Sequence, residues 1–360
     1  MPERLIPERL MSERLVITPM RARAPLRLGL AGGGTDLSPY CDQYGGAVLN
    51  VTIDRFAFAH VSPSTDGQIV FRASDLGEEE RYAPGHDIDG GAGLILHKAV
   101  YHHFVETYLG GEPLPLVVST TADAPPGSGL GSSSAVVVAL IEAFRAALDA
   151  PLGPYEVARL AFEIERLRLG LAGGRQDQYA AAFGGLNYIE FLDGERVVVN
   201  PLRASRDHLI ELESSLVACF TGQSRRSETI IREQLKGLNA EDPVTLESMH
   251  ALKADATSMK AAVLAGDVRE VAEILNRSWR AKKRTANGVA TSEVDRLYDL
   301  AMAAGAWGGK VSGAGGGGFL MLLTDPENRY RLVEALNAAG GQAGAVKFTY
   351  DGAEAWRVRR

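Results

Sequence analysis

The fold of this chain is decided by one stretch, Pro125-Pro126-Gly127-Ser128-Gly129-Leu130-Gly131-Ser132-Ser133-Ser134-Ala135. The apolar residues 115–120 before it are typical of a strand, and the apolar residues 136–144 after it are typical of a buried helix. Glycines let the backbone approach phosphate oxygens closely, and the free N–H groups at a helix start attract negative charge. A serine hydroxyl there is also an oxygen ligand for Mg²⁺. The stretch therefore predicts a phosphate-binding loop.

The simpler alternative is an ordinary strand-to-helix turn that a serine caps. Two prolines, three spaced glycines and four serines within eleven residues are more than such a turn needs. The common ATP-binding loop, G-x-x-x-x-G-K-[ST], is excluded because no lysine follows these glycines.

Composition limits the classes of protein to consider. The 360 residues allow one large or two medium domains, and 46% hydrophobic with 23% charged residues is typical of a globular protein. A net charge of −7 argues against nucleic acid as the main partner. Cys41 and Cys219 lie far apart, which indicates no disulfide framework and favours a cytoplasmic location. No apolar run reaches membrane-spanning length, and no signal-peptide core is recognisable.

A second stretch, residues 21–36, combines a strand pattern with a triple-glycine turn. We expect an alternating strand to place Arg27 on one face, where its fixed guanidinium can stabilise charge on a phosphoryl group. The turn then presents Thr35 and Asp36, and a carboxylate suits sugar hydroxyls because it accepts two strong hydrogen bonds. The alternative is a hairpin turn with surface charges.

Residues 154–169 have a helical pattern that ends in two acidic positions before the loop Gly173-Gly174-Arg175-Gln176-Asp177-Gln178. Helical geometry separates Glu163 from Glu165 by about 200°, so the two glutamates cannot share one face. Arg175 could bind a substrate phosphate or be a solvated loop charge. Arg225, which follows a strand predicted at 217–222, allows the same two interpretations.

The glycine run at 313–318 formally matches G-x-G-x-x-G. It leads into an apolar strand instead of a helix, so we reject a dinucleotide site.

Other segments are assigned by periodicity alone. The three histidines at 97, 102 and 103 lack zinc-ligand spacing, which makes them packing or surface residues. We expect strands at 51–61, 68–73 and 345–350, a hairpin at 187–199, a polar loop at 75–89, a domain junction at 209–217, and helices at 94–109, 224–237, 243–265, 267–283, 291–304 and 327–339.

Three stretches, at residues 21–36, 125–135 and 313–318, resemble motifs 1, 2 and 3 of the GHMP small-molecule kinases in that order along the chain. Together they span residues about 21 to 320. Gly34 stands where many members have histidine. The variants A-P-L-R-L-G-L-A-G-G-G-T-D and G-L-A-G-G-R-Q-D-Q-Y are similar to the branch that acts on D-glycero-D-manno-heptose 7-phosphate. The resemblance implies an α+β fold of two domains, the first like domain 2 of ribosomal protein S5 and the second ferredoxin-like. We place these domains at 20–208 and 209–360, after a flexible tail at 1–19 whose true start codon is left open.

The resemblance also implies ATP and Mg²⁺ and assigns roles to residues. Asp177 matches the catalytic aspartate, and Arg27 would stabilise developing charge. Ser133 and Glu165 would hold Mg²⁺. The implied nucleotide-binding residues are Pro126, Gly127, Ser128, Gly129, Leu130, Gly131, Ser132, Ser133, Ser134, Gly313, Gly315 and Gly316. The implied substrate-binding residues are Gly34, Thr35, Asp36, Arg175 and Arg225.

The expected activity is ATP-dependent phosphorylation of the anomeric hydroxyl of that heptose 7-phosphate, with small molecules as the partners. Neither the anomer, a preference for ATP over GTP nor a homodimer is decided. Two alternatives are a GHMP kinase for another sugar, such as fucose or a higher-carbon sugar phosphate, and a non-catalytic ligand-binding protein of the same fold. The presence of Asp177 disfavours the second alternative.

Overall fold

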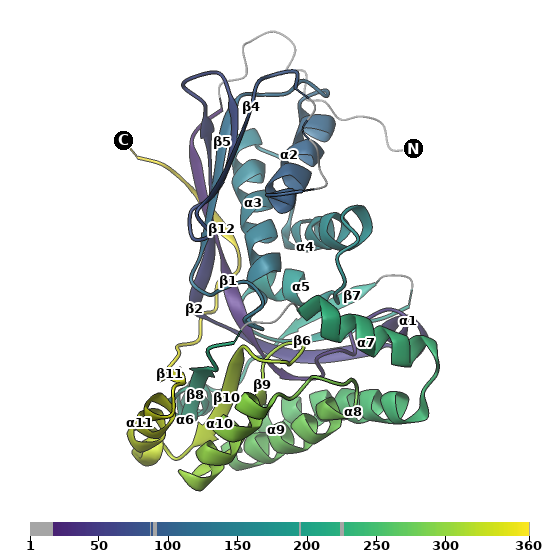
Figure 1. Ribbon diagram of the computed structural model, residues 1–360, viewed down its shortest axis with the longest axis vertical. Coiled ribbons are helices and arrows are strands. Elements are labelled where there is room, and N and C mark those ends of the chain that lie inside the picture. Colours follow the sequence, from purple (N-terminus) through teal and green to yellow (C-terminus); the bar gives the residue numbers. More distant parts are fainter. Residues whose placement is uncertain (1–16, 87, 89–91, 194–195, 224–226, 360) are drawn as a thin grey trace.

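The computed structural model describes residues 17–86, 88, 92–193, 196–223 and 227–359. Two sheets and their helices form an upper and a lower part joined at a waist (Figure 1). This confirms an α+β architecture.

An eight-stranded sheet forms the upper part. Its strands are β1 Met20–Ala31, β2 Gly46–Pro63, β3 Ile69–Ala73, β4 Glu78–Tyr82, β5 Leu116–Ala122, β6 Leu186–Phe191, β7 Val197–Pro201 and β12 Glu354–Arg357. The order along the sheet is β12-β1-β2-β5-β3-β4, and β6 pairs with β2 and β7. The 18-residue β2 is long enough to pair with three strands, β1, β5 and β6, and so joins the two ends of this sheet.

The helices of the upper part are α1 Tyr40–Tyr44, α2 Ile95–Tyr108, α3 Ser132–Leu148, α4 Pro154–Phe162, the π-helical turn η2 Glu163–Arg168, and α5 Gln176–Phe183. Helix α3 lies against β1 and β2 and is buried almost all round, which explains its nearly continuous apolar sequence. Its N-terminus therefore lies at a defined place beside the sheet.

A four-stranded antiparallel sheet of order β11-β8-β10-β9 forms the lower part. Its strands are β8 Leu216–Phe220, β9 Ala306–Val311, β10 Phe319–Thr324 and β11 Gln342–Gly344. The helices of this part are α6 Arg206–Ser215, α7 Ser227–Asn239, α8 Pro243–Ala265, α9 Val268–Lys283, α10 Ser292–Ala303, the 3₁₀ turn η3 Pro326–Asn328, and α11 Arg329–Ala338. Helix α7 lies at the waist (Figure 1).

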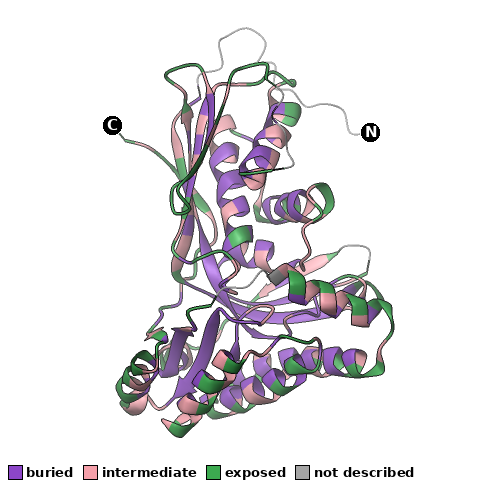
Figure 2. Ribbon diagram, viewed as in Figure 1, coloured by how far each residue is buried: buried purple, intermediate pink, exposed green. Residues whose placement is uncertain are grey.

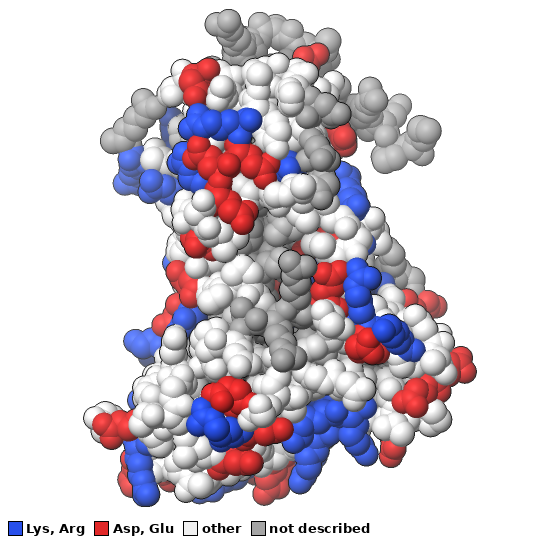
Figure 3. Space-filling view, viewed as in Figure 1, with Lys and Arg blue, Asp and Glu red and all other residues white. Residues whose placement is uncertain are grey.

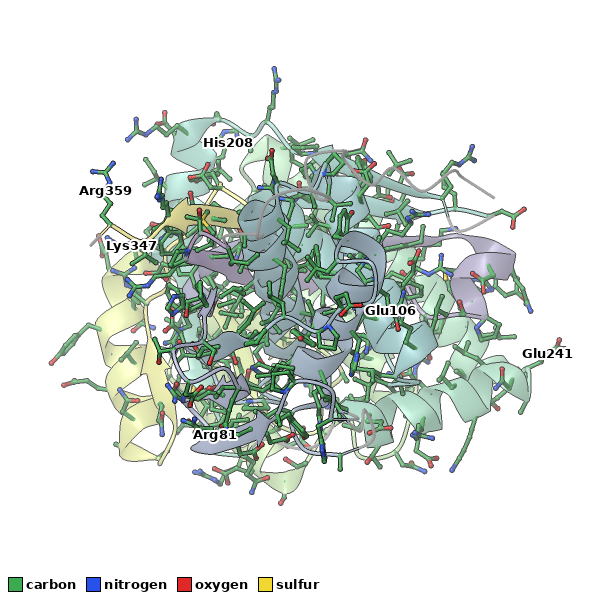
Figure 4. All side chains as sticks on the ribbon, turned by 90° about the horizontal axis from the view of Figure 1, so that it is seen from above. Arg81, Glu106, His208, Glu241, Lys347 and Arg359 are labelled. Carbon is green, nitrogen blue, oxygen red and sulfur yellow. The ribbon has the colours of Figure 1, made fainter. Side chains whose placement is uncertain are left out.

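The largest hydrophobic core runs along the upper sheet and continues into α8 and α9. Figure 2 shows buried residues along the strands of both sheets and on the helix faces turned toward them. Seen from above, side chains fill the space between the layers, while the labelled Arg359 and Glu241 lie at opposite edges (Figure 4).

Three expectations from periodicity are wrong, and a fourth is not tested. The polar segment 75–89 contains β4, because charged residues are compatible with an edge strand, and Glu79 pairs there with Arg72 of β3. The segment 209–217 lies in α6 and β8, on the path of the chain from β7 of the upper sheet to the lower sheet, and its assignment as a domain junction stays a prediction. The segment 345–350 makes only a bridge between Ile53 and Phe348, and the last strand is β12. Strand β1 is buried continuously from Ala24, so it does not alternate.

Candidate active site

The loop between β5 and α3 has the backbone that its glycines predict. Gly127, Gly129 and Gly131 all have positive φ, between 74° and 81°. Helix α3 begins directly after Gly131, at Ser132. Residues other than glycine rarely adopt these backbone angles. The three glycines therefore allow the loop to present its backbone N–H groups and the serine hydroxyls at the positive end of helix α3.

The second glycine loop, residues 313–318 between β9 and β10, packs directly on the first one. The Phe319 N–H donates to the Ser128 carbonyl at 3.0 Å, and the Ser312 hydroxyl donates to the Gly129 carbonyl at 2.9 Å. A Cβ added to Gly129 would lie 2.3 Å from the Ser312 carbonyl oxygen. The upper and lower parts therefore meet backbone to backbone at the phosphate loop.

A pocket of about 300 Å³ opens where the two loops meet. Its lining contains most of the predicted site residues: Arg27, Gly34, Asp36, Pro126, Gly127, Gly129, Gly131, Ser132, Ser133, Ser134, Glu165, Asp177 and Gly313. It does not include Thr35, Ser128, Leu130, Arg175, Gly315 or Gly316. Arg225 lies outside the described residues.

Arg27 and Asp177, both on the lining of this pocket, form an ion pair. Nε and Nη2 of Arg27 both donate to Oδ1 of Asp177, at 2.8 and 2.5 Å. The Nη1 group of Arg27 donates to the Gly129 carbonyl and to the Ser312 hydroxyl. The other carboxylate oxygen of Asp177 lies toward Gly131, since a Cβ there would be 3.3 Å from Oδ2. The pair thus holds the aspartate at the start of α3.

Glu165 is buried on the π-helical turn, whereas Glu163 is half-buried and pairs with Arg159. The carboxylate of Glu165 accepts hydrogen bonds from the Ser134 hydroxyl at 3.1 Å and from the Gln178 amide at 2.5 Å. Burial raises the pKa of Glu165, against the lowering effects of Arg166, Gln178 and Ser134. A cation would relieve this desolvation, and carboxylate with hydroxyl oxygens suits Mg²⁺.

Of the serines at the start of α3, Ser134 and not Ser133 contacts Glu165, although Ser133 was predicted to share the metal with Glu165. Ser134 contacts Glu165, while the exposed Ser133 lines the pocket one residue earlier. No group of three or more acidic, histidine or cysteine side chains within the described ranges could hold a metal by itself. A Mg²⁺ site here would therefore also need oxygens from phosphate, as is usual for this ion.

Asp36 is held in place by the turn and by the start of α5. Oδ1 accepts from the Gly34 N–H and the Gln176 amide, and Oδ2 accepts from the Gln176 N–H. The Thr35 hydroxyl is bonded to the Gly32 and Ala47 carbonyls and is fully buried. Thr35 therefore shapes the turn, and Asp36 faces the pocket.

Arg175 lies beside the pocket and is buried. Its guanidinium donates to Ser38 and Asp42, each at 3.3 Å, and lies 5.1 Å from the centre of the Phe162 ring. The structure thus separates Arg175 from its neighbour Asp177, because the helix start at 176 turns the two side chains apart.

Two buried lysines come from the lower part. The Lys282 ammonium lines the pocket and donates to the Gly33 carbonyl at 2.8 Å, and Lys310 donates to the Gly29 carbonyl. Burial lowers the pKa of Lys282 to about 8 and that of Lys310 to about 7. Lys282 is not among the site residues predicted from the sequence. The usable signal was a lysine within the buried stripe of α9, three residues after Trp279.

A second pocket of about 370 Å³ adjoins the first one. The two pockets share Pro126, Ser132, Ser133 and Leu171. Most of the second lining is apolar or backbone, from β3, the start of α2 and β5. The phosphate loop therefore lies between an apolar pocket and a polar one.

Basic and acidic side chains are interspersed over the upper and lower parts of the face in Figure 3. None of the helices in the described part of the chain combines the length and apolar character that crossing a membrane requires.

Comparison with known proteins matches residues 95–185 to the GHMP kinases N terminal domain and residues 259–342 to the GHMP kinases C terminal domain. The chain is 43% identical to D-glycero-alpha-D-manno-heptose 7-phosphate kinase of Campylobacter jejuni, over 94% of this chain and 99% of that protein. It is 27% identical to the bifunctional fucokinase/GDP-fucose pyrophosphorylase of Arabidopsis thaliana, over 89% of this chain and 32% of that protein. Among solved structures, a D-glycero-D-manno-heptose 1-phosphate kinase of Bacteroides thetaiotaomicron superposes with a TM-score of 0.81 at 41% identity, over 95% of this chain and 100% of that one.

Proposed function

Because this chain belongs to the GHMP kinase family, we propose that it transfers the γ-phosphoryl group of ATP to the anomeric hydroxyl of D-glycero-α-D-manno-heptose 7-phosphate. The product is the 1,7-bisphosphate. The choice of acceptor follows the Campylobacter jejuni relative, which covers nearly the full chain. The chemistry is supported by one geometric observation: Asp177 lies in the same pocket as the start of α3, held there by Arg27.

The two adjoining pockets support a placement of the two substrates. The apolar pocket suits the base and ribose of the nucleotide, and the shared loop suits its phosphates. The polar pocket with Asp36 then receives the sugar, whose hydroxyls match a carboxylate acceptor. The acceptor hydroxyl and the γ-phosphate would meet beside Asp177.

Each residue in the pocket has a defined task in this proposal. Asp177 accepts the proton of the anomeric hydroxyl. The oxygen of that hydroxyl bonds to the γ-phosphorus, and the bond from the γ-phosphorus to the ADP oxygen breaks. Arg27 keeps Asp177 oriented and adds positive charge beside the transferred group. Glu165 and Ser133 would hold Mg²⁺, which neutralises phosphate charge when bound.

A sugar panel tests the proposal. We expect ADP release, measured by a coupled assay, to be fastest with the heptose 7-phosphate among phosphorylated and free heptoses, fucose and other hexoses. Fucose as the best acceptor would instead favour the activity suggested by the fucokinase relative. No turnover of any sugar by folded, ATP-binding protein would favour a ligand-binding role.

A further inference from the structure

Lys282 is a buried cation with hydrogen-bonding capacity to spare. It stands at the end of α9 and reaches across the waist to the turn after β1. Its ammonium group has three N–H bonds, and the described contacts give it one acceptor, the Gly33 carbonyl at 2.8 Å. The side chain is only 4% exposed, yet it lines the pocket. A desolvated ammonium in this state is costly unless an anion joins it.

The nearby charges do not satisfy this ammonium. Asp36 is the acidic group that acts on Lys282, but three donors from Gly34 and Gln176 already occupy its carboxylate. Arg27 adds a second positive charge and is itself paired with Asp177. Lys310 interacts with Lys282 as well, but burial lowers its pKa to about 7 and it does not line this pocket. None of these described neighbours accepts the two remaining N–H bonds of Lys282, which an anionic group of the ligand could accept.

The turn beside Lys282 has glycine at both position 33 and position 34. Gly34 has φ of +106°, and a Cβ added there would lie 3.0 Å from Nζ of Lys282. The nearest other atoms belong to Met249, a neutral residue of α8. A glycine at this point leaves space in front of the ammonium.

The other cations on the lining, as far as the structure describes it, are already engaged. Arg166 donates to the Gly174 and Leu171 carbonyls and lies 3.7 Å from Glu165. Arg27 directs its donors to Asp177, Gly129 and Ser312. Arg166 thus lies beside Glu165, the proposed metal ligand, whereas Lys282 stands at the Gly33–Gly34 turn, away from the loop that would hold the nucleotide phosphates.

We infer that Lys282 binds the phosphate group that the acceptor already carries. This inference rests on the proposed function and deepens it, because it names the group that distinguishes a sugar phosphate from a free sugar. Lys282 is then a specificity-determining residue that leaves the anomeric hydroxyl free to reach Asp177.

The direct test compares Lys282→Met with wild type on heptose 7-phosphate and on free heptose. A charge-assisted hydrogen bond is worth about 1.5–3 kcal/mol, so kcat/KM for the phosphorylated acceptor should fall about 10- to 100-fold. The values for free heptose and the KM for ATP should stay within about 2-fold. Lys282→Arg should recover part of the loss. Lys283→Met, the matched control, removes a charge that pairs with Asp295 and does not line the pocket.

Two further measurements are a variant of Arg175, the other candidate ligand for the substrate phosphate, and the pH dependence of the preference for the phosphorylated acceptor. Arg175→Met should leave the preference for the phosphorylated acceptor unchanged. The pKa of Lys282 is lowered to about 8 by burial, with Arg27 adding to this effect and Asp36 opposing it. The preference should therefore decline above about pH 8 in wild type and stay level in Lys282→Arg, whose guanidinium does not titrate there. An equal loss on both acceptors in Lys282→Met, or a loss confined to Arg175→Met, would overturn the assignment.

Phosphate binding separates this inference from the proposed function. Calorimetry with inorganic phosphate, on protein saturated with a non-hydrolysable ATP analogue, needs neither heptose nor turnover. Weaker binding of phosphate by folded Lys282→Met supports the site even if the natural acceptor is a different sugar phosphate. Unchanged binding removes Lys282 as the phosphate ligand even if the heptose is confirmed as the acceptor.

Discussion

Arg27 donates both Nε and Nη2 to a single oxygen of Asp177, Oδ1. The two residues lie 150 positions apart in the chain. Because one oxygen takes both donors, Oδ2 stays directed toward Gly131 and the start of α3. An arginine that locks one carboxylate oxygen while the other faces the phosphate loop fixes both the position and the orientation of the proposed base.

Asp177→Asn should therefore lower kcat with little effect on ATP binding. The amide keeps the size of the side chain but cannot accept the proton, and positioned bases contribute about 10²–10⁴-fold. Steady-state kinetics and ATP titration measure the two effects. Asp207→Asn, an exposed position on α6, is the control. Near wild-type kcat in a folded Asp177→Asn protein would remove this residue from the mechanism.

Glu165→Gln should raise the Mg²⁺ concentration needed for half-maximal activity. The amide keeps the length of the buried side chain but loses the negative charge that would face the ion. Glu163→Gln is a matched control on the same turn, because Glu163 contacts only Arg159 in the described ion pairs. Identical Mg²⁺ titrations for the two variants would contradict the metal assignment.

Ser133→Ala and Ser134→Ala should differ. Ser134 supports Glu165 through a 3.1 Å hydrogen bond, whereas Ser133 is exposed on the pocket lining. We expect Ser133→Ala to weaken the apparent Mg²⁺ affinity with little change in melting temperature. Ser134→Ala should lower the free energy of unfolding by about 1–3 kcal/mol, since it removes two buried hydrogen bonds, one to Glu165 and one from Gln178. Thermal unfolding and Mg²⁺ titration of both variants check this division.

Gly129→Ala should destabilise the protein more than Gly67→Ala. Both glycines have positive φ, which costs alanine about 1–2 kcal/mol at either position. Only at Gly129 would the added Cβ meet a backbone atom, the Ser312 carbonyl oxygen at 2.3 Å, while nothing lies within 4 Å at Gly67. The excess loss in thermal unfolding measures the contact between the two glycine loops. Equal losses would show that this contact can relax freely.

Lys310→Met should become relatively less stable than wild type as the pH rises. Burial lowers the pKa of Lys310 to about 7, with Lys282 and Arg27 adding to this and Asp255 opposing it. The unfolded lysine titrates near 10.4. Between these values the unfolded wild-type chain binds more protons than the folded one, so its free energy of unfolding rises with pH. Chemical denaturation at pH 7 and pH 10 measures the effect, and Lys347→Met, an exposed lysine, should show none.

Local patterns in the sequence were enough for much of the fold and for part of the site. The phosphate loop was predictable because positive φ, close backbone approach and a helix start each restrict the residue type within eleven positions. The long helix 243–265 is confirmed at both ends, since a proline at its first position and a glycine after its last are local signals. Helical geometry separated Glu163 from Glu165, and the family resemblance then pointed to Glu165.

Tertiary structure alone decided the remaining features, because they depend on groups that are distant in sequence. Strand β12 returns to pair with β1, which no local pattern of residues 354–357 indicates. The contact of Ser134 with Glu165 depends on how α3 packs against η2, and the contact of Arg175 with Asp42 depends on how α1 lies beside the start of α5. Lys282 contacts Gly33, which lies 249 positions away in the chain. Its pKa is shifted only because folding buries its ammonium group near Asp36. Backbone conformation is a local property, whereas desolvation and charge pairing arise only when the two parts of the molecule meet.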